Sequence, residues 1–217
     1  MKSKRVLKII IAVIFFAAFG VYTYLVQTYD VAAVGPLGSQ VGFATFNKRI
    51  ADSITPNEML YELTQLLGYF SIFICLIFAF IGAKQLFTRK SLKKVDPDII
   101  CLGILYSLAI AAYVIFDIVA INYRPVLEDG MLAASYPSSH TVLGIVVFGS
   151  LLIEIKRRIK DRTKAFIEEI ACLAMIAIII GARMLSGWHW MTDITGGVIL
   201  SCALLATFKA ILPEMKN

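Results

Sequence analysis

The chain contains only two histidines, His140 and His189, and each lies in a short polar segment beside an apolar run. Asp193 follows His189 by four residues, a spacing that brings two side chains onto one face of a helix. Asp193 could then accept the proton of one ring nitrogen and leave the other nitrogen free as a nucleophile. Taken alone, a structural hydrogen bond would explain this spacing equally well.

Two arginines lie in the same polar segments. Arg124 and Arg183 can bind phosphate oxygens in a bidentate manner and neutralise their charge. Pro137 is typical of the first turn of a helix, so we expect the free amides of Ser138, Ser139 and the next residue to point outward from a helix N-terminus. The two serine hydroxyls add further donors. These features together predict a binding site for a phosphate group.

Each feature also has an ordinary structural interpretation. An Arg-Pro pair at the end of an apolar run is a common boundary, and Pro-Ser-Ser-His is a common helix start. Trp188, Trp190, Tyr123 and Tyr136 are typical of the aromatic belt at a membrane interface. The combination favours function, because two arginines, two histidines and one aspartate converge from three separate connections without an evident structural reason.

The composition indicates the elements that must position these residues. Hydrophobic types make up 59 % of the 217 residues and charged types 17 %, with a mean hydropathy of +0.80. Soluble domains carry about 45–50 % apolar and about 25 % charged residues. The surplus predicts a membrane protein, here a single domain spanning 1–217. The net charge of +6 would suit nucleic acid, but the basic residues cluster beside apolar runs, so we expect membrane lipids and no nucleic acid as partners.

Six apolar runs predict an all-α fold, a polytopic bundle of six transmembrane helices, since a helix needs about 20 residues to cross a bilayer. The fourth run is short. The first could be a signal peptide, but its apolar stretch is long and no clear cleavage site follows, which favours a retained helix. The runs are Val6–Val26, Met59–Phe87, Asp98–Ile121, Thr141–Ile155, Ala165–Leu185 and Ile194–Leu212.

Charge alternates between the connections. Most of the 21 lysines and arginines lie at the two termini and in the second and fourth connections. The positive-inside rule therefore predicts cytoplasmic termini in a cell membrane. The segments near 27–58, 122–140 and 186–193 would then share the non-cytoplasmic face, where all the candidate site residues lie. The short outer ends of the last three spans further predict a slightly recessed site, open sideways to a lipid.

The pattern resembles the type 2 phosphatidic acid phosphatase superfamily, the membrane relatives of vanadium haloperoxidases. That family shows three blocks, K-x6-R-P, P-S-G-H and S-R-x5-H-x3-D. The Arg-to-His and His-to-Asp spacings of the third block match in full, and the resemblance covers a core of about 98–212. The matching residues are Pro137-Ser138-Ser139-His140 for the second block and Ala182-Arg183, His189 and Asp193 for the third.

The resemblance implies a role for each residue. His189 would be the nucleophile that forms a phosphohistidine, Asp193 would orient it, and His140 would protonate the leaving oxygen. Phosphoryl transfer needs its equatorial oxygens stabilised by metal ions or arginines. These segments hold no carboxylate cluster fit for Mg²⁺, so we expect neither metal nor cofactor. The residues implied to hold the phosphoryl group are Arg124, Arg183, Ser138 and Ser139.

Three positions depart from the family pattern. Ala182 replaces a serine and removes one hydroxyl, and Ser139 replaces a glycine and leaves less room around its amide. Asp117 stands seven residues before Arg124, where the family has lysine. A phosphate-binding cation is thus replaced by a possible anion.

Several interpretations of Asp117 remain open. It could pair with a nearby arginine, since both lie on roughly the same helix face. Alternatively, Lys48 or Arg49 could replace the lost charge, the site could prefer a less charged phosphate, or only binding could remain. Retained catalysis is favoured, because both histidines and the aspartate persist. Phe43 and Phe46, beside these two cations, indicate an amphipathic stretch that either shapes a lipid entrance or fills space.

The sequence therefore predicts metal-independent dephosphorylation of a lipid phosphate or lipid diphosphate at the outer face of the membrane, through a phosphohistidine. A lipid phosphotransferase using the same site is the nearest alternative. A non-catalytic lipid-phosphate binder is the alternative from another class.

Overall fold

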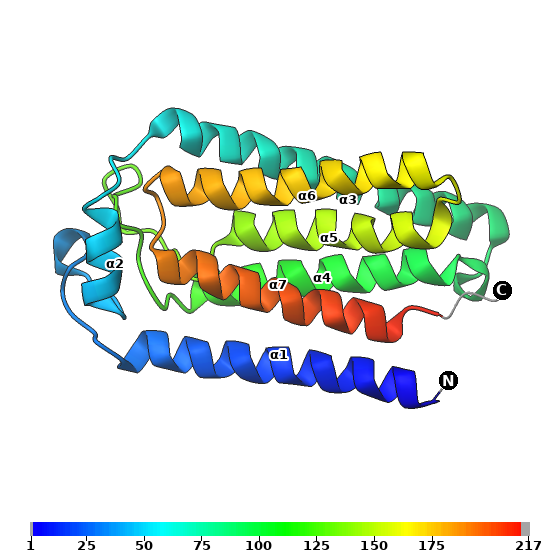
Figure 1. The fold of residues 1–217 in the computed structure, drawn as a ribbon, viewed down its shortest axis with the longest axis horizontal. Coiled ribbons are helices and arrows are strands. Elements are labelled where there is room, and N and C mark those ends of the chain that lie inside the picture. Colours follow the sequence, from blue (N-terminus) through cyan, green and yellow to red (C-terminus); the bar gives the residue numbers. More distant parts are fainter. Residues whose placement is uncertain (1, 214–217) are drawn as a thin grey trace.

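Six long apolar helices run side by side through the molecule (Figure 1). The computed structural model describes residues 2–213. Each of the six is long and apolar enough to cross a membrane, and the shortest, α5, has 20 residues. The predicted all-α fold of six spans is therefore confirmed. The helices are α1 (Lys2–Thr28), α3 (Glu58–Arg89), α4 (Pro97–Ile118), α5 (Ser139–Arg158), α6 (Arg162–Leu185) and α7 (Met191–Ile211).

The prediction of a short fourth span was wrong. α5 starts two residues earlier than expected and continues to Arg158. Its last turn is stabilised by a 2.9 Å ion pair between Arg158 and Glu154, four residues apart, and by three basic residues near the helix C-terminus. Hydropathy alone missed this turn because its residues are charged. The recessed site was predicted because the last spans were expected to be short. Because α5 has 20 residues, its length no longer supports that prediction.

α5 and α7 are the central helices. Buried residues make up 61 % of the most apolar stretch of α5 and 56 % of that of α7, against 22 % or less in each of the other four. The outer helices expose large apolar side chains such as Phe73, Phe80 and Ile110. Such surfaces are costly in water and suit a bilayer, in which every helix satisfies its own backbone hydrogen bonds.

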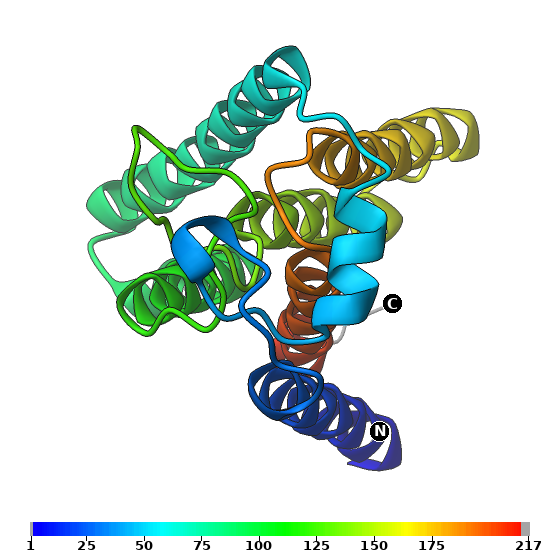
Figure 2. The ribbon, with the colours of Figure 1, turned by 90° about the vertical axis from the view of Figure 1, so that its left-hand side faces the viewer.

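A short helix, α2 (Ala44–Ala51), lies across one end of the bundle (Figures 1 and 2). We call this the loop end, because residues 29–57, 119–138 and 186–190 connect the helices there. Two 3₁₀ turns, Pro36–Gly38 and Leu92–Lys94, complete the elements, and the described residues form only isolated β-bridges. The start of α1 and the end of α7 lie at the opposite end (Figure 1).

The side of the membrane that the loop end faces stays a prediction from the charge pattern. Ser53, after α2, and Lys160, between α5 and α6, are exposed at opposite ends. In intact cells, we expect Ser53→Cys to react with a membrane-impermeant thiol reagent and Lys160→Cys to react only after lysis. Labelling of both is read by gel shift against the unsubstituted chain. The reverse pattern would place the loop end in the cytoplasm.

Candidate active site

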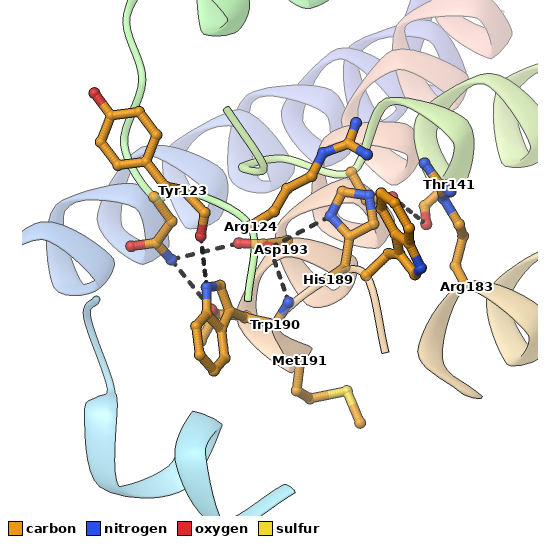
Figure 3. A network of polar contacts seen from close by, with 12 residues as sticks. Tyr123, Arg124, Thr141, Arg183, His189, Trp190, Met191 and Asp193 are labelled. Carbon is orange, nitrogen blue, oxygen red and sulfur yellow. Dashed lines mark hydrogen bonds and ion pairs between the residues drawn. The ribbon is translucent and has the colours of Figure 1, made fainter. Parts of the chain in front are cut away.

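His189 and Asp193 meet at the start of α7. The chain turns after α6 at Gly187, whose φ of 72° is the left-handed conformation that glycine adopts without strain. His189 then precedes the first residue of α7 by two positions, so the expectation that both side chains share a helix face was wrong. They still approach, with His189 Nδ1 3.4 Å from Asp193 Oδ2, because the carboxylate folds back over the helix N-terminus (Figure 3).

Asp193 is completely buried and held from several sides. Its Oδ2 accepts a 3.0 Å hydrogen bond from the Trp190 amide, and its Oδ1 accepts one of 3.4 Å from Asn122 Nδ2. Its backbone carbonyl accepts a 3.0 Å bond from the Ser138 amide. A buried carboxylate needs such partners. The contacts fix the oxygen that faces His189 and bring the three motif segments together.

Asn47 and Asn122 are site-building residues that the sequence analysis missed. Asn47, on α2 and only 1 % exposed, donates a 2.8 Å hydrogen bond to the Thr192 hydroxyl. Asn122 Oδ1 accepts a 3.3 Å bond from the Gly42 amide. Segment 27–58 is thus tied to the first turn of α7 beside Asp193. The available signal in the sequence was Asn47, a polar residue within the predicted amphipathic stretch.

The other nitrogen of His189, Nε2, is buried and has no hydrogen-bond partner among the described residues. Burial lowers the pKa of His189 well below its ordinary value of 6.5, and the nearby positive charges of Arg183 and Arg124 lower it further. The ring is therefore neutral at physiological pH. With Asp193 as acceptor at Nδ1, the ring presents a free lone pair at Nε2, as a nucleophile requires.

Arg183 and His140 form a second pair. Arg183, in the last turn of α6, is fully buried and donates 2.9 Å to Thr64 Oγ1 and 2.8 Å to His140 Nδ1. A guanidinium can only donate, so His140 Nδ1 accepts and its ring proton lies on Nε2. Arg183 Nε has no partner among the described residues. The pair thus retains a free donor at Arg183 Nε and an N–H group at His140 Nε2.

Arg124 approaches from the loop after α4. Its Nη1 donates a 3.2 Å hydrogen bond to the Tyr61 hydroxyl and lies 3.4 Å from Glu128 Oε2. Its guanidinium also lies 5.9 Å from the ring centroids of Tyr61 and Trp188. In Figure 3 the Arg183 side chain lies on the far side of His189 from Asp193, while the Arg124 side chain runs past the His189 ring. The positive charges of both arginines therefore lie near the His189 ring.

The start of α5 differs in detail from the prediction. Ser138 is the N-cap and Ser139 the first helical residue, so Pro137 precedes the helix and does not lie in its first turn. The Ser138 amide is already bonded to the Asp193 carbonyl, and its hydroxyl accepts a 3.0 Å bond from Thr141. The amides of Ser139 and His140, which have no partner within the helix, are left for an anion.

Asp117 lies apart from these residues. It is exposed on the last turn of α4 and forms no ion pair with any described residue. The suggested pairing with an arginine is therefore not formed. Lys48 is exposed and pairs with Asp52 at 3.0 Å, and Arg49 is exposed on α2. Arg124 and Arg183 are thus the cations in contact with the site.

A cavity of about 210 Å³ lies beside the site, between α2 and the connections that carry the motif residues. Lys48, Asp52, Pro125 and Trp190 contribute to its lining. A smaller hollow that reaches His189 shares Trp190 with it. Within residues 2–213, no group of three or more His, Cys, Asp and Glu side chains is placed to hold a metal ion.

The six apolar helices define a multi-pass membrane protein. The family model of the PAP2 superfamily matches residues 11–215, so the chain belongs to that superfamily. The fold is similar to the crystal structure of a transmembrane PAP2-type phosphatidylglycerolphosphate phosphatase from Bacillus subtilis, with a TM-score of 0.64 and 17 % identity over 92 % of this chain and 94 % of that one. No curated protein gives a significant sequence match.

Gly68 on α3 sets the position of His140. A Cβ at Gly68 would lie 2.6 Å from Cδ2 and 2.9 Å from Nε2 of that ring. We expect Gly68→Ala to displace the imidazole and lower phosphate release by roughly 10- to 100-fold, because a shift of about 1 Å in a reacting group costs that much. Gly103→Ala on α4, where a Cβ meets nothing within 4 Å, is the control. Equal turnover of both purified variants would contradict this role of Gly68.

Proposed function

We propose that the protein is a metal-independent phosphatase that acts on a lipid phosphate or lipid diphosphate at the non-cytoplasmic face, through a phosphohistidine on His189. One observation carries the proposal. His189 Nε2 is buried and unpartnered among the described residues, while its Nδ1 faces Asp193. A buried histidine with only a structural role would be expected to have hydrogen-bond partners at both ring nitrogens.

The proposed reaction has two steps. His189 Nε2 attacks phosphorus, and the bond from phosphorus to the leaving oxygen breaks as that oxygen takes a proton from His140. For this step His140 acts as the imidazolium that the bound anion stabilises, with Arg183 turned from its Nδ1 toward the phosphoryl oxygens, and it returns to neutral imidazole. Neutral His140 then takes a proton from water, which attacks the phosphohistidine and releases phosphate and free His189. Asp193 stabilises the positive ring in the intermediate. Arg124, Arg183 and the Ser139 amide would stabilise the equatorial oxygens.

Two observations support a lipid as the substrate. The apolar side chains that cover the outer helices imply that the site opens at the surface of a bilayer. The basic residues at the opposite end favour a non-cytoplasmic site. The alternative of a non-catalytic binder rests on Asp117, which is exposed and forms no ion pair with either arginine; that alternative predicts binding of lipid phosphates without turnover. A phosphotransferase would share the phosphohistidine and would be distinguished by its products when a lipid acceptor is added.

The test is phosphate release from phosphatidic acid, phosphatidylglycerol phosphate and undecaprenyl diphosphate in a chelating buffer. We expect the native protein to hydrolyse at least one of them, and His189→Ala to lose at least about 1,000-fold in turnover, as loss of a nucleophile does. Trapping of ³²P on the native chain, but not on His189→Ala, would identify the intermediate. Activity that requires added Mg²⁺, or that survives in His189→Ala, would contradict the proposal.

The lowered pKa of His189 makes a prediction about pH. Protonation of Nε2 removes the nucleophile, so activity is lost as the pH falls through the folded-state pKa. Because that pKa lies well below 6.5, we expect kcat/KM to hold steady as the pH drops from 7 through 6.5. The measurement is kcat/KM on a lipid phosphate across this range, with folding checked at each pH. An acid limb centred near 6.5 would show that the ring is not desolvated as described.

A further inference from the structure

Tyr61, on α3 and outside all three motif segments, contacts both arginines of the site. Its hydroxyl accepts a 3.2 Å hydrogen bond from Arg124 and one of 2.7 Å from Gln65 Nε2, and it donates one of 3.0 Å to Glu128 Oε1. Its ring lies 5.3 Å from the Arg183 guanidinium carbon. A phenol has one proton and two lone pairs, so every hydrogen-bonding position of Tyr61 is occupied.

The Tyr61 ring is itself held in place. It stacks on Trp188 with the centroids 3.8 Å apart and the planes 14° from parallel. Trp188 is the residue before His189, so the stack links α3 to the segment that carries the proposed nucleophile. Stacked aromatic pairs contribute beyond the area that they bury. Tyr61 is thus held in place by Trp188 and contacts both guanidinium groups.

Glu128 contacts Arg124 with one carboxylate oxygen and Tyr61 with the other. Oε2 is 3.4 Å from Arg124 Nη1, and Oε1 accepts from the Tyr61 hydroxyl. The Glu128 side chain is 37 % exposed, while that of Arg124 is only 13 % exposed. It extends from a hairpin in which the Glu128 amide and carbonyl bond to Met131. A carboxylate has the charge and the planar oxygens that a phosphoryl group presents to an arginine.

We propose that Tyr61 is a positioning residue for Arg124, and that Glu128 competes with phosphate for Arg124 by occupying its Nη1. The proposal rests on the proposed function, since it assigns Arg124 to the phosphoryl group. A phosphate that engages Arg124 at Nη1 must displace Glu128, and one that engages its unpartnered Nε still lies beside the Glu128 charge. Glu128 therefore lowers the affinity of the site for anions, whereas the Tyr61 hydroxyl raises it by holding the guanidinium in place.

The variants Glu128→Gln and Tyr61→Phe test the two parts separately. Binding of inorganic phosphate to the purified protein in detergent is measured by thermal shift and by inhibition of turnover. We expect Glu128→Gln to bind phosphate roughly 3- to 10-fold more tightly, since one competing charge is removed while the side-chain shape is kept. Tyr61→Phe keeps the ring on Trp188 and should bind phosphate roughly 3- to 10-fold more weakly. Its KM should rise more than its kcat falls.

The matched control is Glu62→Gln, which neutralises an exposed carboxylate next to Tyr61 on α3 that has no polar contact with the described site residues. It should bind phosphate as the native protein does. Unchanged or weaker binding by Glu128→Gln overturns the part assigned to Glu128, and native-like binding by Tyr61→Phe overturns the part assigned to Tyr61. The thermal-shift measurement needs no turnover, so failure of the proposed function would appear separately, as absence of hydrolysis.

Discussion

The buried carboxylate of Asp193 is the constraint on which the rest of the site depends. A charge with no exposed surface must be surrounded by donors, and those donors come from the chain itself. The Trp190 amide and His189 supply them from the connection before α7, and Asn122 supplies one from the connection between α4 and α5. The Ser138 amide, at the other end of that second connection, binds the carbonyl of the same aspartate. Satisfying one aspartate thus brings the ends of α4, α5 and α7 together. The orientation of His189 follows from this packing.

The bilayer makes this arrangement stable in a chain of 217 residues. The four outer helices need no further protein to cover their apolar faces, because lipid does so. The two central helices, α5 and α7, are therefore the ones whose first turns are enclosed by protein, and both carry site residues. α2 covers this end through Asn47, which connects it to the turn of α7 next to Asp193. The first loop is thus part of the site architecture.

The sequence predicted what depends on local patterns. Hydropathy gave the six spans, and the third motif block gave Arg183, His189 and Asp193 with their family, which the family model confirms. It placed Pro137 and His189 wrongly relative to the helices, because helix starts depend on which side chain caps the first turn. It missed Tyr61, Gly68 and Glu128. The contacts of Tyr61 and Gly68 join residues more than 60 positions apart, and Glu128 contacts an arginine of its own irregular loop. No periodicity records such contacts.

The replacement of the motif lysine by Asp117 changes how the proposed site must hold its anion. The site holds two guanidinium groups and two carboxylates, Glu128 and Asp193, and both histidines are neutral in the geometry described, so the formal charges of these side chains cancel. Affinity for a phosphoryl group must then come from oriented donors rather than from total charge. Oriented donors act only if they cannot turn away, since a flexible cation would first have to be ordered. The burial of Arg183 and the stack of Tyr61 on Trp188 supply that rigidity. In this chain, fixed geometry therefore takes the place of the charge that the family pattern places on α4.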